Sequence, residues 1–124
     1  MSGVPIDFSK LQKIAQSGQA VVPVIVQHIT TKAVLMLAYV NEDALNESLR
    51  TGVATFWSTS RNVLWVKGAT SGHLMRLHEV RVNCENNALL FWVTPHPEGV
   101  CHVTDDTGKH RSTCFSNRIF AHMV

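Results

Sequence analysis

The chain has 124 residues, of which 45% are hydrophobic, and a formal net charge of +2 at pH 7. This length and apolar fraction predict one compact domain over residues 1–124, and the even spread of charge gives no reason to expect a nucleic-acid partner. No apolar run approaches the roughly 20 residues of a membrane span and the N-terminus lacks a secretory pattern, so we expect a cytoplasmic protein with no membrane partner.

Near the N-terminus, Asp7 or Ser9 can cap a short helix whose apolar residues recur at helical spacing, and Gly18 is placed to end it. We expect this helix to lie on a sheet. Residues 21–29 and 33–40 are rich in β-branched and large apolar side chains and are separated by a polar turn. They are therefore predicted to form a pair of strands.

The second predicted helix covers residues 42–51, because Asn41 can cap it, acidic residues occupy its first turn and Gly52 can stop it. Four short strand-like runs follow, separated by polar or glycine-rich turns, and their spacing predicts an antiparallel meander: 53–58, 62–67, 74–82 and 88–95. The expected fold class is α+β, a compact, largely antiparallel folded sheet with two short helices.

Three cysteines, Cys84, Cys101 and Cys114, are too far apart in sequence to form a CxxC motif. Each of them taken singly could be ordinary core filling, since free cysteine is among the most buried residue types. Each, however, has polar, turn-like neighbours, which favours thiolates that bind zinc. Three protein ligands would leave a tetrahedral zinc one open position for water, as in catalytic sites.

A specific resemblance is carried by the run VLMLAYVNEDALNESLRTGVATFWSTSRNVLWVKGATSGHLMRLHEVRVNCENNALL, followed by CH, TG and STCF. Over roughly residues 21–118 the chain resembles phosphoribosyl-AMP cyclohydrolases, which open the adenine ring of phosphoribosyl-AMP between N1 and C6 in histidine biosynthesis. The resemblance implies an intertwined homodimer in which Cys84, Cys101 and Cys114 bind one zinc across the two subunits. It also implies that a zinc-activated water attacks C6.

His102 and His73 are the candidates for moving a proton to the ring nitrogen, because histidine can exchange protons near neutral pH. The ribose and phosphate groups of such a substrate need fixed donors. The segments STSR and KGATSGH offer six of them: Ser58, Ser60, Arg61, Lys67, Thr70 and Ser71. The alternative is that these residues form hairpin turns and solvated charges. Trp57 and Trp65 are expected to pack into the core rather than to stack on a base.

The resemblance also implies a magnesium site of three aspartates around the first cysteine, and here the chain departs from it. The corresponding residues are Asn83, Glu85 and Asn87. Magnesium prefers anionic oxygen ligands, so we expect this site to be weakened or lost.

The segment 103–113 is longer than its counterpart in the family. We consider two roles for it: its acids could restore carboxylates to the magnesium site, or its basic residues could contact the substrate's phosphates. The residues concerned are Asp105, Asp106, Lys109, His110 and Arg111. The alternative is an exposed loop without function.

Two other functions stay open. The chain could be a diverged paralogue that acts on another purine nucleotide, or a non-catalytic, zinc-stapled dimeric binding module. The STSR and KGATSGH segments argue against the binding module, because a metal staple needs no anion-binding pocket. A zinc ion closed by four protein ligands would favour it.

Overall fold

The structure, a computed structural model, describes residues 4–97, 99–100, 106–109 and 111–122. Within these ranges none of the helices is both long enough and apolar enough to cross a membrane. The described chain contains two helices and six strands: α1 (Lys10–Ser17), β1 (Val22–His28), β2 (Val34–Val40), α2 (Glu42–Thr51), β3 (Thr55–Ser58), β4 (Val63–Val66), β5 (Arg76–Val82) and β6 (Leu89–Thr94). These elements agree with the predicted α+β class.

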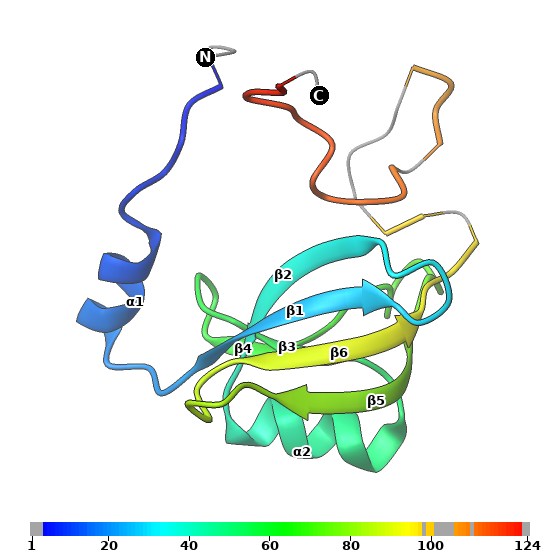
Figure 1. Ribbon diagram of the computed structural model, residues 1–124. Helices are drawn as coiled ribbons and strands as arrows, with labels where there is room; N and C mark the ends of the chain where they lie inside the picture. The colour runs from blue at the N-terminus through cyan, green and yellow to red at the C-terminus, as the bar shows by residue number, and fades with distance from the viewer. Residues whose placement is uncertain (1–3, 98, 101–105, 110, 123–124) are drawn as a thin grey trace.

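The larger sheet has the strand order β2-β1-β6-β5, and β3 and β4 form a separate two-stranded sheet (Figure 1). The predicted pairing of β1 with β2 is confirmed and is antiparallel, and β5 pairs antiparallel with β6. The predicted meander is wrong in its order, because β4 does not pair with β5 and β6 instead lies parallel to β1. A parallel contact between strands so far apart in sequence leaves no local signal.

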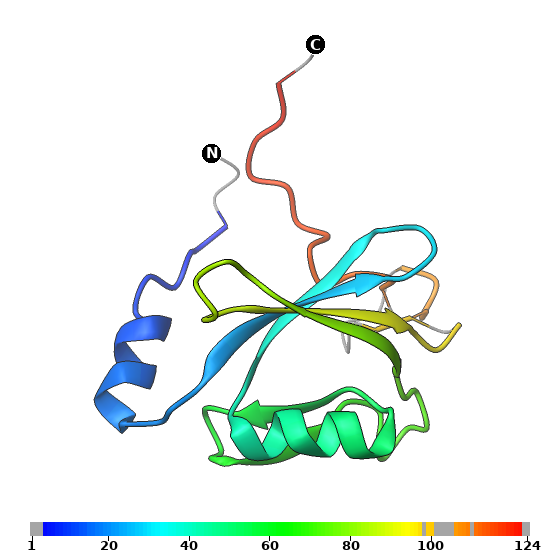
Figure 2. The same cartoon turned by 60° about the horizontal axis from the view of Figure 1, so that its bottom comes forward.

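One face of the larger sheet carries the core. The hairpin of β3 and β4 lies beneath this face together with α2 (Figure 2). The rings of Phe56 on β3 and Phe91 on β6 stack with their centroids 6.0 Å apart, and both side chains are fully buried. Burial of such aromatic side chains stabilises the contact between the two sheets.

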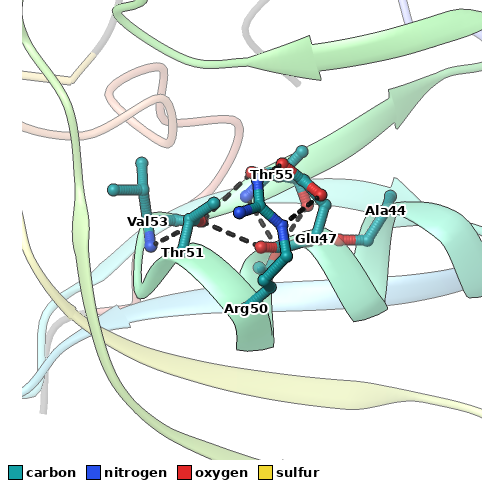
Figure 3. Close-up of polar contacts among 7 residues, drawn as sticks. Ala44, Glu47, Arg50, Thr51, Val53 and Thr55 are labelled. Carbon is teal, nitrogen blue, oxygen red and sulfur yellow. Dashed lines mark hydrogen bonds and ion pairs between the residues drawn. The ribbon is translucent and has the colours of Figure 1, made fainter.

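Helix α2 begins and ends as predicted. The Asn41 side chain accepts a hydrogen bond of 2.9 Å from the backbone N–H of Ala44, and Gly52 ends the helix in the left-handed conformation. The buried hydroxyl of Ser48 donates to the carbonyl oxygen of Ala44 at 2.9 Å and accepts a 2.9 Å hydrogen bond from the backbone N–H of Thr55. Figure 3 shows these two partners, Ala44 on the helix and Thr55 on β3. This hydroxyl joins the helix to β3.

Helix α1 also forms where it was predicted, but the expectation that it lies on the sheet is wrong. It lies to one side of the larger sheet (Figure 1). Only Ile14 of this helix is buried, whereas Leu11 is 67% exposed and the preceding Phe8 is 90% exposed. The core face of the sheet is already covered by α2 and the hairpin, which leaves no place there for α1.

The opposite face of the larger sheet is partly apolar and open. Ile25 on β1 and Leu37 on β2 are cross-strand partners, and both are nearly half exposed. Farther along this face, the ring of Trp92 is covered by the amino group of Lys32 at 3.8 Å and the guanidinium of Arg81 at 4.3 Å. The unprotected apolar surface is therefore concentrated on β1 and β2.

Candidate active site

A cavity of about 610 Å³ opens beside β4. The cavity is lined by side chains and backbone from β4, the loop that follows it and the segment after β6: Arg61, Val63, Leu64, Trp65, Val66, Lys67, Gly68, Ala69, Thr70, Ser71, His73, Gly99 and Val100. Five of the predicted site residues thus meet in one place.

Two cations stand at the ends of β4, with Arg61 just before this strand and Lys67 just after it. In the part of the chain that the structure describes, the ion pairs are Glu47 with Arg50 and Glu79 with Arg81, and neither involves the two cavity cations. A guanidinium and an ammonium that line a cavity without a carboxylate partner are suited to an anionic ligand.

The two predicted serines lie in the turn that carries Arg61. The hydroxyl of Ser58 accepts a 3.2 Å hydrogen bond from the backbone N–H of Arg61 and lies 3.4 Å from the hydroxyl of Ser60. Neither serine is among the residues that line the cavity. Their predicted contact with substrate stays a prediction, and in this structure Ser58 helps to fix the backbone of the turn.

The loop from Lys67 to His73 is shaped by a glycine. Gly68 has φ +82°, and a Cβ atom at this position would lie 2.2 Å from the carbonyl oxygen of His73, so a larger residue cannot be accommodated without movement of the backbone. A hydrogen bond of 2.7 Å from the N–H of Gly72 to the carbonyl of Gly68 closes the loop. This compact turn places Thr70, Ser71 and His73 on the wall of the cavity.

His73 has a neighbour that sequence reasoning missed. Its ring stacks on the ring of His96 with centroids 4.3 Å apart and planes 18° apart. His96 lies just after β6, more than twenty residues later in the chain, and no motif marks it. Only the fold, which brings the end of β6 to the loop after β4, reveals this pair.

The predicted magnesium residues lie in the turn between β5 and β6, where they bond to one another. The side-chain oxygen of Asn83 accepts 2.9 Å hydrogen bonds from the backbone N–H groups of Asn87 and Ala88, and its amide nitrogen donates to the side-chain oxygen of Asn87 at 2.7 Å. The amide of Asn87 in turn donates to Glu85 at 3.2 Å. Only one of these side chains is anionic, and the amide oxygens are already used, so the turn does not fit a magnesium ion.

Two of the three cysteines are described, and both are exposed. Cys84 lies in the β5–β6 turn, beside the start of β6, whereas the backbone N–H of Cys114 bonds to the carbonyl oxygen of Leu35 at the start of β2. Leu35 is the neighbour of Met36, which pairs with Val26 of β1, and Val26 in turn pairs with Phe91 of β6. Phe91 is three residues from Ala88, or about 10 Å along the strand. The two thiols therefore lie toward opposite ends of the sheet.

Cys101 and His102 lie outside the described residues, as do Asp105 and His110. Over the ranges that are described, the fold brings together no group of three or more His, Cys, Asp or Glu side chains that could hold a metal ion. Asp106 and Lys109 are exposed, and the carbonyl of Arg111 accepts a 3.1 Å hydrogen bond from the N–H of Val100, which lines the cavity.

Comparison with known proteins gives consistent matches. A family model described as phosphoribosyl-AMP cyclohydrolase matches residues 36–116, a range that contains every predicted site residue. The curated phosphoribosyl-AMP cyclohydrolase of Cupriavidus necator is 42% identical over 105 residues, which cover 85% of this chain and 74% of that protein. The enzyme of the same name from Archaeoglobus fulgidus is 45% identical over 101 residues, or 82% of this chain and 87% of that protein.

Proposed function

The chain belongs to the phosphoribosyl-AMP cyclohydrolase family, hydrolases of histidine biosynthesis, and from this premise we propose that it opens the adenine ring of phosphoribosyl-AMP at the N1–C6 bond. The product would be the formimino aminoimidazole carboxamide ribonucleotide. The observation that carries this proposal is the cavity beside β4, where Arg61, Lys67, Thr70, Ser71 and His73 meet.

The cavity suits a phosphorylated nucleoside. Its volume of about 610 Å³ is in the range of small-molecule sites. Arg61 and Lys67 would bind phosphate oxygens through charge-assisted hydrogen bonds, which are stronger than neutral ones. The hydroxyls of Thr70 and Ser71 would donate to phosphate or ribose oxygens.

The reaction adds water across the bond between C6 and N1. The oxygen of water bonds to C6, the bond from C6 to N1 breaks, and a proton reaches N1. His73 is the histidine among the described residues that line the cavity, and it would deliver this proton as a general acid. His102 is the second candidate, from the sequence alone.

We propose that Cys84, Cys101 and Cys114 hold zinc, with the protein in the reducing cytoplasm, where thiols persist. Exposed thiols in Cys84 and Cys114 are suitable donors. Zinc, when bound by three thiolates, supplies a Lewis acid that can lower the pKa of water to about 7.

We further propose that the zinc ligands come from two subunits of a homodimer. Two sulfurs on one zinc lie within about 4 Å of each other, because each bond is about 2.3 Å long. The positions of Cys84 and Cys114 toward opposite ends of the sheet argue against one chain supplying both. A second copy could also cover the apolar surface of Ile25 and Leu37.

The zinc-sharing arrangement predicts complementation between two variants. Cys84→Ser and Cys114→Ser homodimers should each lack zinc and activity. A mixed dimer would keep one intact site, made from the unchanged Cys84 of one subunit and the unchanged Cys114 of the other. Zinc content and activity should therefore return after the two variants are unfolded and refolded together. If each chain held its own zinc, mixing would restore nothing.

Magnesium is proposed to have no site at Asn83, Glu85 and Asn87, since these side chains are bonded to one another. The alternative that Asp105 and Asp106 restore carboxylates stays a prediction. Replacing both with asparagine should leave the response of activity to added magnesium unchanged if the segment has no such role.

The activity is tested by following the absorbance of phosphoribosyl-AMP during incubation with the zinc-loaded protein, with and without magnesium. Ring opening that does not need magnesium is expected. Turnover of another purine nucleotide in place of phosphoribosyl-AMP would identify a diverged paralogue. No turnover of either, together with a zinc ion closed by four protein ligands, would identify a binding module and overturn the proposal.

A further inference from the structure

Trp65 occupies a position between the two cations of the cavity. It lies on β4 and lines the cavity, while Arg61 precedes this strand and Lys67 follows it. The amino group of Lys67 lies over the Trp65 ring, 5.7 Å from its centre. An aromatic surface thus lies in the same cavity as the groups suited to phosphate.

The ring is held in place by the core. The side chain is half-buried, and the ring of Phe56 packs on it with centroids 5.7 Å apart and planes at 45°. Phe56 is itself fully buried and stacked on Phe91. A ring supported from within the core and open to a cavity loses little conformational freedom when a flat ligand stacks on it.

The other two tryptophans have different surroundings. Trp57 donates a 3.0 Å hydrogen bond to the side chain of Gln19 and lines another cavity, of about 370 Å³. Trp92 lies on the opposite face of the larger sheet beneath Lys32 and Arg81. Of the three tryptophans of the chain, all within the described residues, Trp65 is the one that lines the cationic cavity.

We propose that Trp65 is the platform on which the adenine ring of the substrate stacks, and that it determines specificity for a purine over other phosphorylated compounds. This inference rests on the proposed function. Phosphoribosyl-AMP carries a phosphorylated ribose on each side of its purine, and the cavity has a cation at each end of β4. A base on Trp65 would take the place of the Lys67 amino group over the ring, and Lys67 and Arg61 would then reach the two phosphates from opposite sides.

The test uses the intrinsic fluorescence of the zinc-loaded protein with two probes, AMP and ribose 5-phosphate, which lacks the base. AMP should quench the emission of the wild type and of Trp57→Phe, and should leave that of Trp65→Phe unquenched. Calorimetric titration should show AMP binding weakened about 10- to 100-fold in Trp65→Leu, because a base stacked on an aromatic side chain contributes on this scale. Ribose 5-phosphate should bind to wild type and Trp65→Leu equally.

Trp65→Phe also serves where Trp65→Leu fails to fold, because a phenyl ring keeps the packing on Phe56 and should bind AMP more weakly than the wild type does. AMP affinity unchanged in a folded Trp65 variant, or no quenching by AMP in the wild type, would overturn the platform. Quenching through Trp65 in a protein that does not turn over phosphoribosyl-AMP would leave the platform standing and reject the proposed reaction instead.

Discussion

Two turns of the molecule are rich in polar residues but use them differently. In the loop after β4, the glycines shape the backbone, and Lys67, Thr70 and Ser71 line a cavity. The hydroxyl of Ser71 accepts a 3.3 Å hydrogen bond from the backbone N–H of His73 and keeps its own proton to donate. In the turn between β5 and β6, Asn83 and Asn87 hydrogen-bond to each other and to the backbone. A polar residue in a turn is available to a ligand when it keeps a donor or acceptor that the turn does not use for its own structure.

The largest loss of stability is expected for a substitution at Gly68, the glycine that shapes the cavity loop. Gly68→Ala should lower the free energy of unfolding by about 3 kcal/mol or more, because it combines a left-handed backbone with a clash against the carbonyl of His73. Gly72→Ala is the matched control: its φ is +81° but nothing lies within 4 Å of the added Cβ, so a cost of about 1 kcal/mol is expected. Denaturant unfolding measures both, and equal losses would mean that the close approach at Gly68 does not constrain the loop.

The next effect concerns the cations. Arg61→Ala and Lys67→Ala should each raise KM for phosphoribosyl-AMP about 10- to 100-fold, since a hydrogen bond to a charged group contributes about 1.5–3 kcal/mol. Stability should change little, because neither residue belongs to an ion pair among the described residues. Arg50→Ala, on α2 and paired with Glu47, is the control that should leave KM unchanged. Steady-state kinetics would refute the phosphate role if all three variants behaved alike.

Local signals predicted the elements better than their assembly. Helix α2 was predictable because Asn41 caps its first turn and Gly52 ends its last turn, and both signals are local in sequence. The contact of β1 with β6 depends on side chains buried between two layers, such as Val24 and Phe91, and no spacing in the sequence reports which strands meet. The position of α1 was mispredicted for the same reason, since the apolar positions of a helix do not reveal whether another element already covers the sheet.

The candidate site also contains residues that local motifs pointed to and residues that only the fold brings together. Arg61 and Lys67 were candidate phosphate ligands because they belong to the polar STSR and KGATSGH segments, and the structure brings both to one cavity. Their contact with phosphate stays a prediction. Trp65 was expected in the core, and it does pack on Phe56, but its other surroundings depend on segments distant in sequence. His96 lay beyond any sequence argument for the same reason.

The amide turn predicts a smaller effect, which depends on the metal. Asn83→Asp combined with Asn87→Asp should lower the free energy of unfolding by about 2 kcal/mol without magnesium, because two carboxylates would replace groups now joined at 2.7 Å. Millimolar magnesium should restore the loss, since a ligand that binds only the folded state stabilises it. Asn83→Asp alone is the control, because the amide of Asn87 can turn and donate to the new carboxylate. Thermal unfolding that does not respond to magnesium in the double variant would show that the turn cannot hold the ion.

The smallest effect is expected for Glu47 and Arg50, which bond to each other on the exposed surface of α2. The hydrogen bond from Arg50, together with its charge, lowers the pKa of Glu47 below the usual glutamate range. A carboxylate whose folded pKa is lowered stabilises the protein above its unfolded pKa, and this contribution is lost as the pH falls through the folded value. The difference in unfolding free energy between wild type and Glu47→Gln should therefore be present at neutral pH and vanish in acid. The pKa of Asp7, lowered by hydrogen bonds from Ser9, cancels because both proteins contain it. A difference that persisted in acid would mean that Glu47 contributes through packing rather than through its charge. Its contribution would then be structural, like that of the neutral amides in the β5–β6 turn.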